Sequence, residues 1–211
     1  MTTDANETGF SAKADLKTWI FNPFHYLAGG QALALGLAFI VAAGLLGSAV
    51  DVHFDGVLDL HVGMAAPVWL FPIQGTINWL SISVILVVAG YLLSRTRFRI
   101  LDIFGTQALA RAPSMLSAAV AYVPGFRATA LKLAAGNPDM ALPEIAGFTL
   151  AMLVILLAII WMVILMYRGF VVSCNVGGGR AVAVFIAALI LAEVISKAAI
   201  IGLFMVVLPG Y

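Results

Sequence analysis

The chain has 211 residues; 63% are hydrophobic, 10% are charged and the mean hydropathy is +1.09. This composition excludes a water-soluble globular protein, and the formal net charge of +1 gives no indication of a nucleic-acid partner. A single cysteine, Cys174, excludes an internal disulfide framework and a cysteine-based metal cluster. We therefore expect an all-α, polytopic membrane protein with one membrane domain over residues 13–211.

The N-terminal region divides into a tail and a segment suited to the membrane surface. Residues 1–12 are small and polar, which predicts a disordered tail. From Lys13 to Gly30, aromatic residues alternate with Lys13, Lys17 and His25. Aromatic rings beside lysines are typical of the headgroup zone, so we expect this segment to lie at the interface.

Five apolar stretches are long enough to cross a bilayer, since a span needs about 20 residues. They cover residues 27–50, 67–93, 103–123, 145–167 and 181–208. In the first span, Gly36 and Gly44 share one face, which predicts close packing against another helix. The second span is expected to begin irregularly around Pro72, and the third to kink at Pro113. Between the third and fourth spans, residues 126–135 predict a short amphipathic helix.

The connection between the first two spans, residues 51–63, alternates apolar and polar side chains about Gly56 and predicts a short hairpin or turn. In an extended chain His53 and Asp55 share one face, as do Asp59 and His61. Two imidazoles and two carboxylates are a candidate site for a divalent metal. The simpler interpretation is that the carboxylates fix the histidine tautomers and order the turn. We assign no metal, cofactor or catalytic residue here.

Five of the polar side chains inside the apolar stretches are candidates for an intramembrane polar network. Gln74 and Asn78 lie one helical turn apart and are expected to face inward and form interhelical hydrogen bonds. Glu193 and Lys197 lie four residues apart with the acid first, the favourable order for an intrahelical pair. Arg111 either reaches the headgroups or pairs inside the bundle. We hypothesise an Arg111, Glu193 and Lys197 network across the third and fifth spans, which either fixes helix registration or forms a proton or ion pathway.

The basic residues that flank the spans predict the orientation of the chain. Seven lie on one side (Lys13, Lys17, Arg95, Arg97, Arg99, Arg168 and Arg180) and two on the other (Arg127 and Lys132). The positive-inside rule then places the N-terminus in the cytoplasm and Tyr211 outside.

Three stretches together resemble the Yip1 domain family of membrane proteins. These are Trp19-Ile20-Phe21-Asn22-Pro23-Phe24 with Ala28-Gly29-Gly30, the run from Asp102 to Pro113 with its Asp-x-x-Gly and Ala-x-x-Pro pattern, and the helix with Glu193-x-x-x-Lys197. The resemblance covers about Lys13 to Leu208. It implies five spans and, for bacterial members, an inner-membrane location without catalytic residues. Eukaryotic relatives are implicated in vesicle trafficking and bind Rab GTPases through a longer N-terminal region.

Three functions stay open at this point. The leading expectation is a non-enzymatic membrane protein of Yip1 type that organises membrane or partners other membrane proteins or itself. The second is a small transporter or channel subunit that uses a polar pathway through Arg111, Glu193 and Lys197. The third is a metal-dependent membrane enzyme at the turn from His53 to His61. In each case the lipid bilayer is the expected surrounding.

Overall fold

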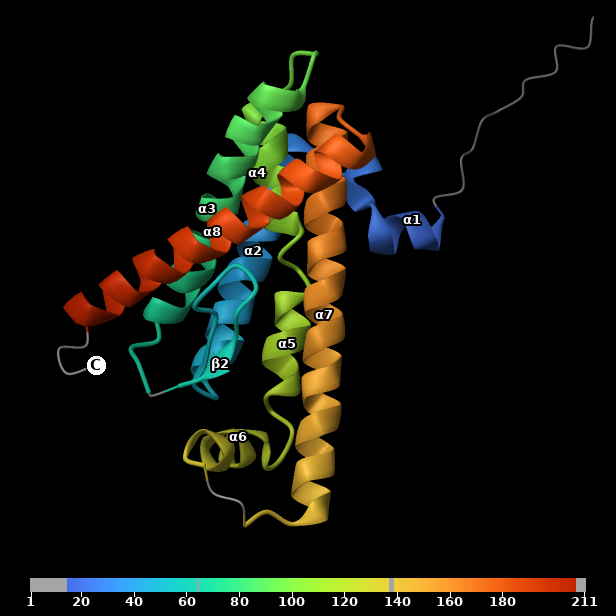
Figure 1. The fold of residues 1–211 in the computed structure, drawn as a ribbon. Helices are drawn as coiled ribbons and strands as arrows, with labels where there is room; N and C mark the ends of the chain where they lie inside the picture. The colour runs from blue at the N-terminus through green and yellow to red at the C-terminus, as the bar shows by residue number, and fades with distance from the viewer. Residues whose placement is uncertain (1–14, 64, 137–138, 208–211) are drawn as a thin grey trace, which may run out of the picture.

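The structure is a computed structural model that describes residues 15–63, 65–136 and 139–207. The predicted tail, residues 1–12, and the predicted outer end at Tyr211 lie outside the described residues. The elements are the helices α1 (Leu16–Phe21), η1 (Pro23–His25), α2 (Gly29–Ser48), α3 (Leu70–Leu93), α4 (Ile100–Leu109), α5 (Ser114–Val120), α6 (Phe126–Ala134), α7 (Leu142–Cys174) and α8 (Gly178–Val207), with two short strands, β1 (Val52–His53) and β2 (His61–Val62). Figure 1 shows α8 crossing the bundle at a steep angle to α7.

Four of these helices, α2, α3, α7 and α8, are long and apolar enough to cross a membrane. Their outward faces carry large apolar side chains, such as Val88 on α3, Leu157 on α7 and Ile190 on α8, each more than half exposed. Because such a surface would be unstable in water, it is a surface for lipid. The chain is therefore a helical, multi-pass membrane protein.

Two of the long helices extend beyond their predicted ends. Helix α7 has 33 residues and runs roughly 50 Å, well beyond the predicted end at 167. Helix α8 begins at Gly178, whose backbone lies in the left-handed region at φ +77°, so only residues 175–177 connect the two. The predicted irregular start of the second span is wrong, because α3 continues without interruption through Pro72. Proline is tolerated there because it lies in the first turn, where backbone N–H groups need no intrahelical acceptor.

The third predicted span, residues 103–123, is not one helix. It is divided into α4 and α5 by residues 110–113, which form consecutive turns closed by hydrogen bonds from Arg111 N–H to Ala108 C=O and from Ala112 N–H to Leu109 C=O. Pro113 has no N–H to donate to Leu109, which accounts for the interruption. The predicted kink is thus a complete break, and Arg111 lies within it.

Close backbone approach holds α2 against its neighbours. A side chain at Gly36 would collide with the backbone of Ala108 in α4, and one at Gly44 would lie 2.6 Å from the backbone nitrogen of Pro72 in α3. The predicted internal packing of this face is confirmed. These contacts place α2 at the centre of the bundle, beside both α3 and the broken α4–α5 pair.

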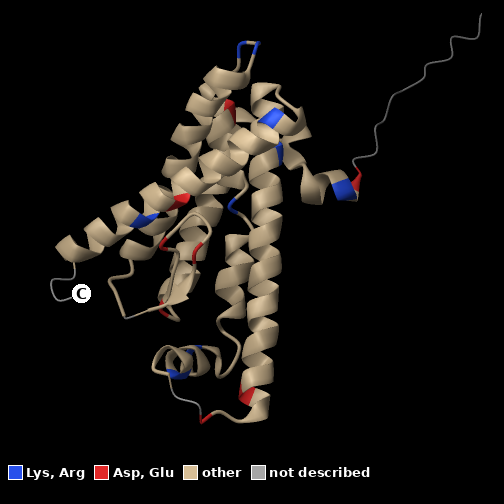
Figure 2. Cartoon of the chain, viewed as in Figure 1, with Lys and Arg blue, Asp and Glu red and all other residues tan. Residues whose placement is uncertain are grey.

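Two short helices lie at the periphery. Helix α1 projects sideways from α7 near one end of the bundle, whereas the amphipathic helix α6, as predicted, lies near the other (Figure 1). Figure 2 shows Lys and Arg in the connections at the α1 end, with further basic residues on α6. At the α6 end, Lys132 and Glu144 form an exposed ion pair of 3.1 Å.

Candidate functional site: a hairpin held inside the helix bundle

The segment between α2 and α3 is a hairpin that folds back among the helices. Strands β1 and β2 are antiparallel, with Val52 opposite Val62 and His53 opposite His61. At its base, Asp51 adopts φ +53° and accepts a 2.6 Å hydrogen bond from Arg127 of α6. Figure 1 shows this hairpin beside α2, between α8 and α5. Val52 and Val57 are buried, so the predicted turn is part of the core.

Helix α3 holds the first arm of the hairpin through its two buried amides. Gln74 accepts a hydrogen bond from Phe54 N–H at 3.2 Å and donates to Nδ1 of His53 at 2.9 Å. Because Nδ1 accepts this bond, the proton of a neutral His53 is on Nε2. Asn78 donates to the carbonyl oxygen of Phe54 at 2.7 Å. The prediction that Gln74 and Asn78 face inward is confirmed, but they bind the hairpin rather than another helix.

Arg111, in the break between α4 and α5, contacts the tip of the hairpin. Arg111 is 5% exposed, and its Nη1 donates a 2.6 Å hydrogen bond to the carbonyl oxygen of Val57. The same nitrogen lies 3.5 Å from the sulfur of Met162 in α7. A continuous helix would direct residue 111 along the helix face, whereas the turn allows it to reach the hairpin.

Helix α8 holds the second arm. The carboxylate of Glu193 accepts a 2.8 Å hydrogen bond from Leu58 N–H, and the ammonium group of Lys197 pairs with Asp59. The hairpin approaches Glu193 so closely at Gly56 that a Cβ atom there would collide with the carboxylate. A larger residue at the predicted turn position would force the Glu193 carboxylate to move.

Arg111, Glu193 and Lys197 are connected through the hairpin rather than directly. No ion pair joins any two of the three among the described residues. Each instead contacts a different point of the hairpin, at Val57, Leu58 and Asp59. The predicted direct pairing is thus wrong, and the hairpin connects α8 to the α4–α5 break.

The four residues of the candidate metal site are divided among separate partners. Asp55 pairs with Nδ1 of His61 at 3.0 Å, whereas His53 stacks on His61 with ring centroids 5.4 Å apart and binds Gln74. Asp59 pairs with Lys197. Over the described ranges, no three His, Cys, Asp or Glu side chains are grouped so that they could hold a metal ion.

The Asp55–His61 pair shifts the acidity of both groups. The hydrogen bond that His61 donates to the Asp55 carboxylate raises the pKa of His61 above its usual value, against the opposing effect of burial. Burial alone would raise the pKa of Asp55, but the hydrogen bond and positive charge of His61 outweigh it, so this pKa lies below its usual value. Both shifts favour an ionised pair that closes the hairpin on itself.

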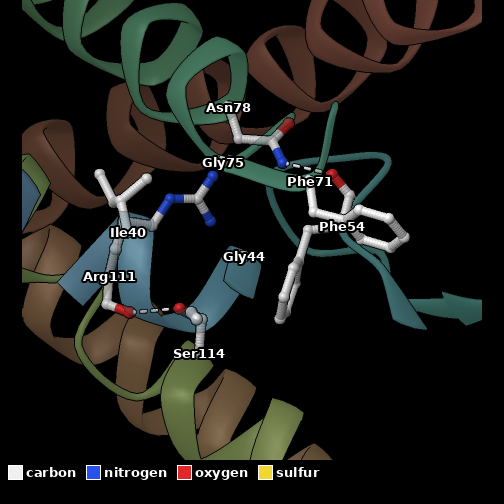
Figure 3. Close-up of a pocket in the computed structure, with 9 residues that line it drawn as sticks. Ile40, Gly44, Phe54, Phe71, Gly75, Asn78, Arg111 and Ser114 are labelled. Carbon is white, nitrogen blue, oxygen red and sulfur yellow. Dashed lines mark hydrogen bonds between the residues drawn. The ribbon is translucent and has the colours of Figure 1, made fainter. Parts of the chain in front are cut away.

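Two small cavities, of about 10 and 20 Å³, lie beside Arg111, and Ser114 and Phe54 line both. Figure 3 shows the guanidinium of Arg111 extending toward Asn78 in the first of them. Nε and Nη2 of Arg111 and Oδ1 of Asn78 have no hydrogen-bond partner within the described part of the chain. Each cavity has room for about one water molecule, and water there would satisfy both the donors and the acceptor.

Sequence reasoning did not find the acceptors and donors on the hairpin backbone. The carbonyl oxygens of Phe54 and Val57 and the N–H of Leu58 meet the intramembrane side chains, yet every residue type except proline carries these groups. The available signal was the presence of five polar residues in the apolar stretches together with a polar connecting segment between the first two stretches. Arg127, which holds Asp51, was considered only for the amphipathic helix and for the orientation of the chain.

The arrangement defines a class: a multi-pass membrane protein in which an inter-helix hairpin occupies the polar interior of the bundle. Comparisons of the chain with protein-family models, with curated proteins and with solved structures find no match.

Proposed function

We propose that the chain is a non-enzymatic integral membrane protein of Yip1 type, which acts through contacts with other membrane proteins or with the bilayer. The observation that carries the proposal is that the hairpin contacts each of the five candidate polar residues, Gln74, Asn78, Arg111, Glu193 and Lys197. A hydrogen bond between two parts of the same chain stabilises one conformation. These residues therefore serve the architecture of the bundle, which presents apolar helix faces to its surroundings.

The resemblance to the Yip1 family is supported by a contact between two of the stretches that carry it. A side chain at Gly105 would collide with the carbonyl oxygen of Gly29, and one at Gly29 would lie 3.2 Å from the carboxylate of Asp102. The Ala-Gly-Gly stretch and the Asp-x-x-Gly pattern thus meet where α2 begins. In this proposal, α4 and α5 together form the third of five spans, the N-terminus is cytoplasmic and the location is a bacterial inner membrane.

A small transporter or channel subunit is the second candidate, and the two small cavities beside the buried Arg111 favour it. Charged side chains inside a membrane protein commonly face water-filled cavities along ion pathways. However, Glu193 lines neither of the two cavities beside Arg111, and Phe54 lines both.

The experiment that separates the two compares the wild-type chain with the double variant Glu193→Gln, Lys197→Met in liposomes. On the leading proposal, wild-type liposomes show no proton or ion flux above empty liposomes. The double variant shows the same background flux and a lower unfolding temperature. A wild-type flux that disappears in a double variant of unchanged fold, judged by circular dichroism, would replace the leading proposal with transport. Purification in mild detergent tests directly whether the chain acts through contacts. The proposal expects a specific membrane protein or a second copy of the chain to be retained.

A further inference from the structure

A separate surface pocket lies where the N-terminal helices cross α7, away from the hairpin. It has a volume of about 240 Å³ and is lined by Lys17, Thr18, Phe21, Asn22, His25 and Arg168. The indole N–H of Trp161 in α7 donates a 2.9 Å hydrogen bond to the carbonyl oxygen of Ile20. Pro23 and Phe24 of η1 are buried. The pocket is therefore formed by packed elements rather than by a loose end of the chain.

Positive charge converges on this pocket from two elements. Lys17 comes from α1 and Arg168 from α7, His25 adds an imidazole, and no carboxylate lines the pocket. No ion pair involves Lys17, His25 or Arg168 within residues 15–63, 65–136 and 139–207. The acid nearest in sequence, Asp15, caps α1 by accepting hydrogen bonds from Lys17 N–H and the Thr18 hydroxyl. The basic side chains that line the pocket are therefore not neutralised by an ion pair among the described residues.

The level of the pocket along α7 indicates what fills it. Arg168 directly follows the apolar run 145–167, so it lies where the hydrocarbon ends and the headgroups begin. On α1, Leu16 is 72% exposed and Phe21 43% exposed, while Trp19 stacks on Tyr26 with ring centroids 4.7 Å apart. Apolar and aromatic side chains beside a cationic pocket match a molecule with a charged head and an acyl tail.

We propose that this pocket binds the headgroup of an anionic phospholipid, with the phosphate held by Lys17 and Arg168. A guanidinium donates two parallel hydrogen bonds to a phosphate, and an ammonium adds a point charge. His25 lies within the same pocket and donates to a phosphate oxygen through a ring N–H. With the orientation predicted from the basic flanks, the lipid comes from the cytoplasmic leaflet, whose surface is negative. The bound lipid then holds α1 at the membrane surface.

The test measures lipid retention by the full chain in nanodiscs of phosphatidylcholine with a minor fraction of phosphatidylglycerol, followed by native mass spectrometry. The variant Lys17→Gln, Arg168→Gln is expected to retain phosphatidylglycerol roughly 30-fold less well than wild type, since each basic residue that contacts the anionic headgroup contributes about fivefold. The matched control Arg95→Gln, Arg97→Gln removes the same charge from the α3–α4 connection and is expected to retain it as wild type does. Arg168→Lys, which keeps the charge, is expected to bind several-fold more weakly because the paired hydrogen bonds are lost.

Three results would overturn the proposal. Equal loss in the pocket variant and the control would mean that the lipid responds to total charge rather than to this pocket. Equal retention of phosphatidylcholine would mean that headgroup charge is irrelevant. Displacement of the lipid by millimolar inorganic phosphate, with phosphate alone bound as tightly, would identify a site for a soluble phosphate instead. Unchanged circular dichroism of Arg168→Lys provides the check that a loss of lipid does not reflect unfolding.

Discussion

Replacing Gly56 with alanine tests the contact between the hairpin and α8. The backbone at this position tolerates alanine, because Gly56 is not among the glycines with a positive φ angle. The new methyl group would, however, collide with the carboxylate of Glu193. A carboxylate at the end of a flexible side chain can rotate away, but it then loses the 2.8 Å hydrogen bond from Leu58 N–H.

The size of the effect follows from that single lost interaction. A hydrogen bond to a charged group contributes about 1.5–3 kcal/mol, so Gly56→Ala is expected to lower the free energy of unfolding by that amount. The matched control is Gly202→Ala in α8, where a Cβ atom meets nothing within 4 Å. That variant is expected to match wild type or gain up to about 1 kcal/mol, since alanine is favoured over glycine in a helix.

The assay is unfolding in dodecyl maltoside titrated with sodium dodecyl sulfate, followed by tryptophan fluorescence. In a Glu193→Ala background the side chain that would collide is absent, so Gly56→Ala is expected to cost less than it does in the wild-type chain. If Gly56→Ala were as stable as Gly202→Ala, or if its cost were unchanged in the Glu193→Ala background, the docking of the hairpin on Glu193 would be refuted.

Three further predictions concern other contacts of the hairpin and the bundle. A double-mutant cycle of Lys197→Met with Asp59→Asn is expected to give a coupling energy of about 0.2–1 kcal/mol, because both side chains are about two-fifths exposed; zero coupling would exclude the pair. The contribution of the Asp55–His61 pair depends on pH. The stability from His61 is fully present below its usual pKa of 6.5 and is lost as pH rises through its raised folded-state pKa. The stability from Asp55 is present above its usual pKa of 3.8 and is lost as pH falls through its lowered folded-state pKa. The difference in unfolding temperature between wild type and His61→Gln should therefore be larger at pH 5.5 than at pH 9, and the reverse order would contradict the pair. Finally, Gly36→Ala is expected to destabilise the protein by about 1–3 kcal/mol through collision with the α4 backbone, whereas an unchanged unfolding curve would exclude that contact.

The sequence was sufficient for the features that depend on a local pattern. The long apolar runs predicted α2, α3, α7 and α8, and the small residues Gly36 and Gly44 predicted which face of α2 packs inside. Helix ends were less accurate, because α7 continues beyond Arg168 into the headgroup zone. An apolar run shows where hydrocarbon ends, but hydrogen bonding within the helix continues in water.

The partners of Arg111, Glu193 and Lys197 could not be predicted, for a physical reason. Helical spacing indicates the face on which Glu193 and Lys197 lie, but not what approaches that face. The direct network was the simplest solution among side chains, whereas the hairpin offers backbone groups at Val57 and Leu58 that carry no sequence signature. The break at Pro113 was visible as a kink, but its role of turning Arg111 toward the hairpin required the three-dimensional arrangement.

The most direct test of the central claim, that the hairpin lies inside the bundle, is the rate at which a membrane-impermeant maleimide labels Val57→Cys in the native membrane. Val57 is 1% exposed, whereas Ala65, just beyond the hairpin, is exposed and provides the reference variant Ala65→Cys. The native Cys174 is 0% exposed and should contribute no background. We predict that position 57 reacts at least about tenfold more slowly than position 65, because labelling requires local opening, and that Glu193→Gln accelerates it. Equal labelling rates at positions 57 and 65 in the otherwise wild-type chain would contradict the account.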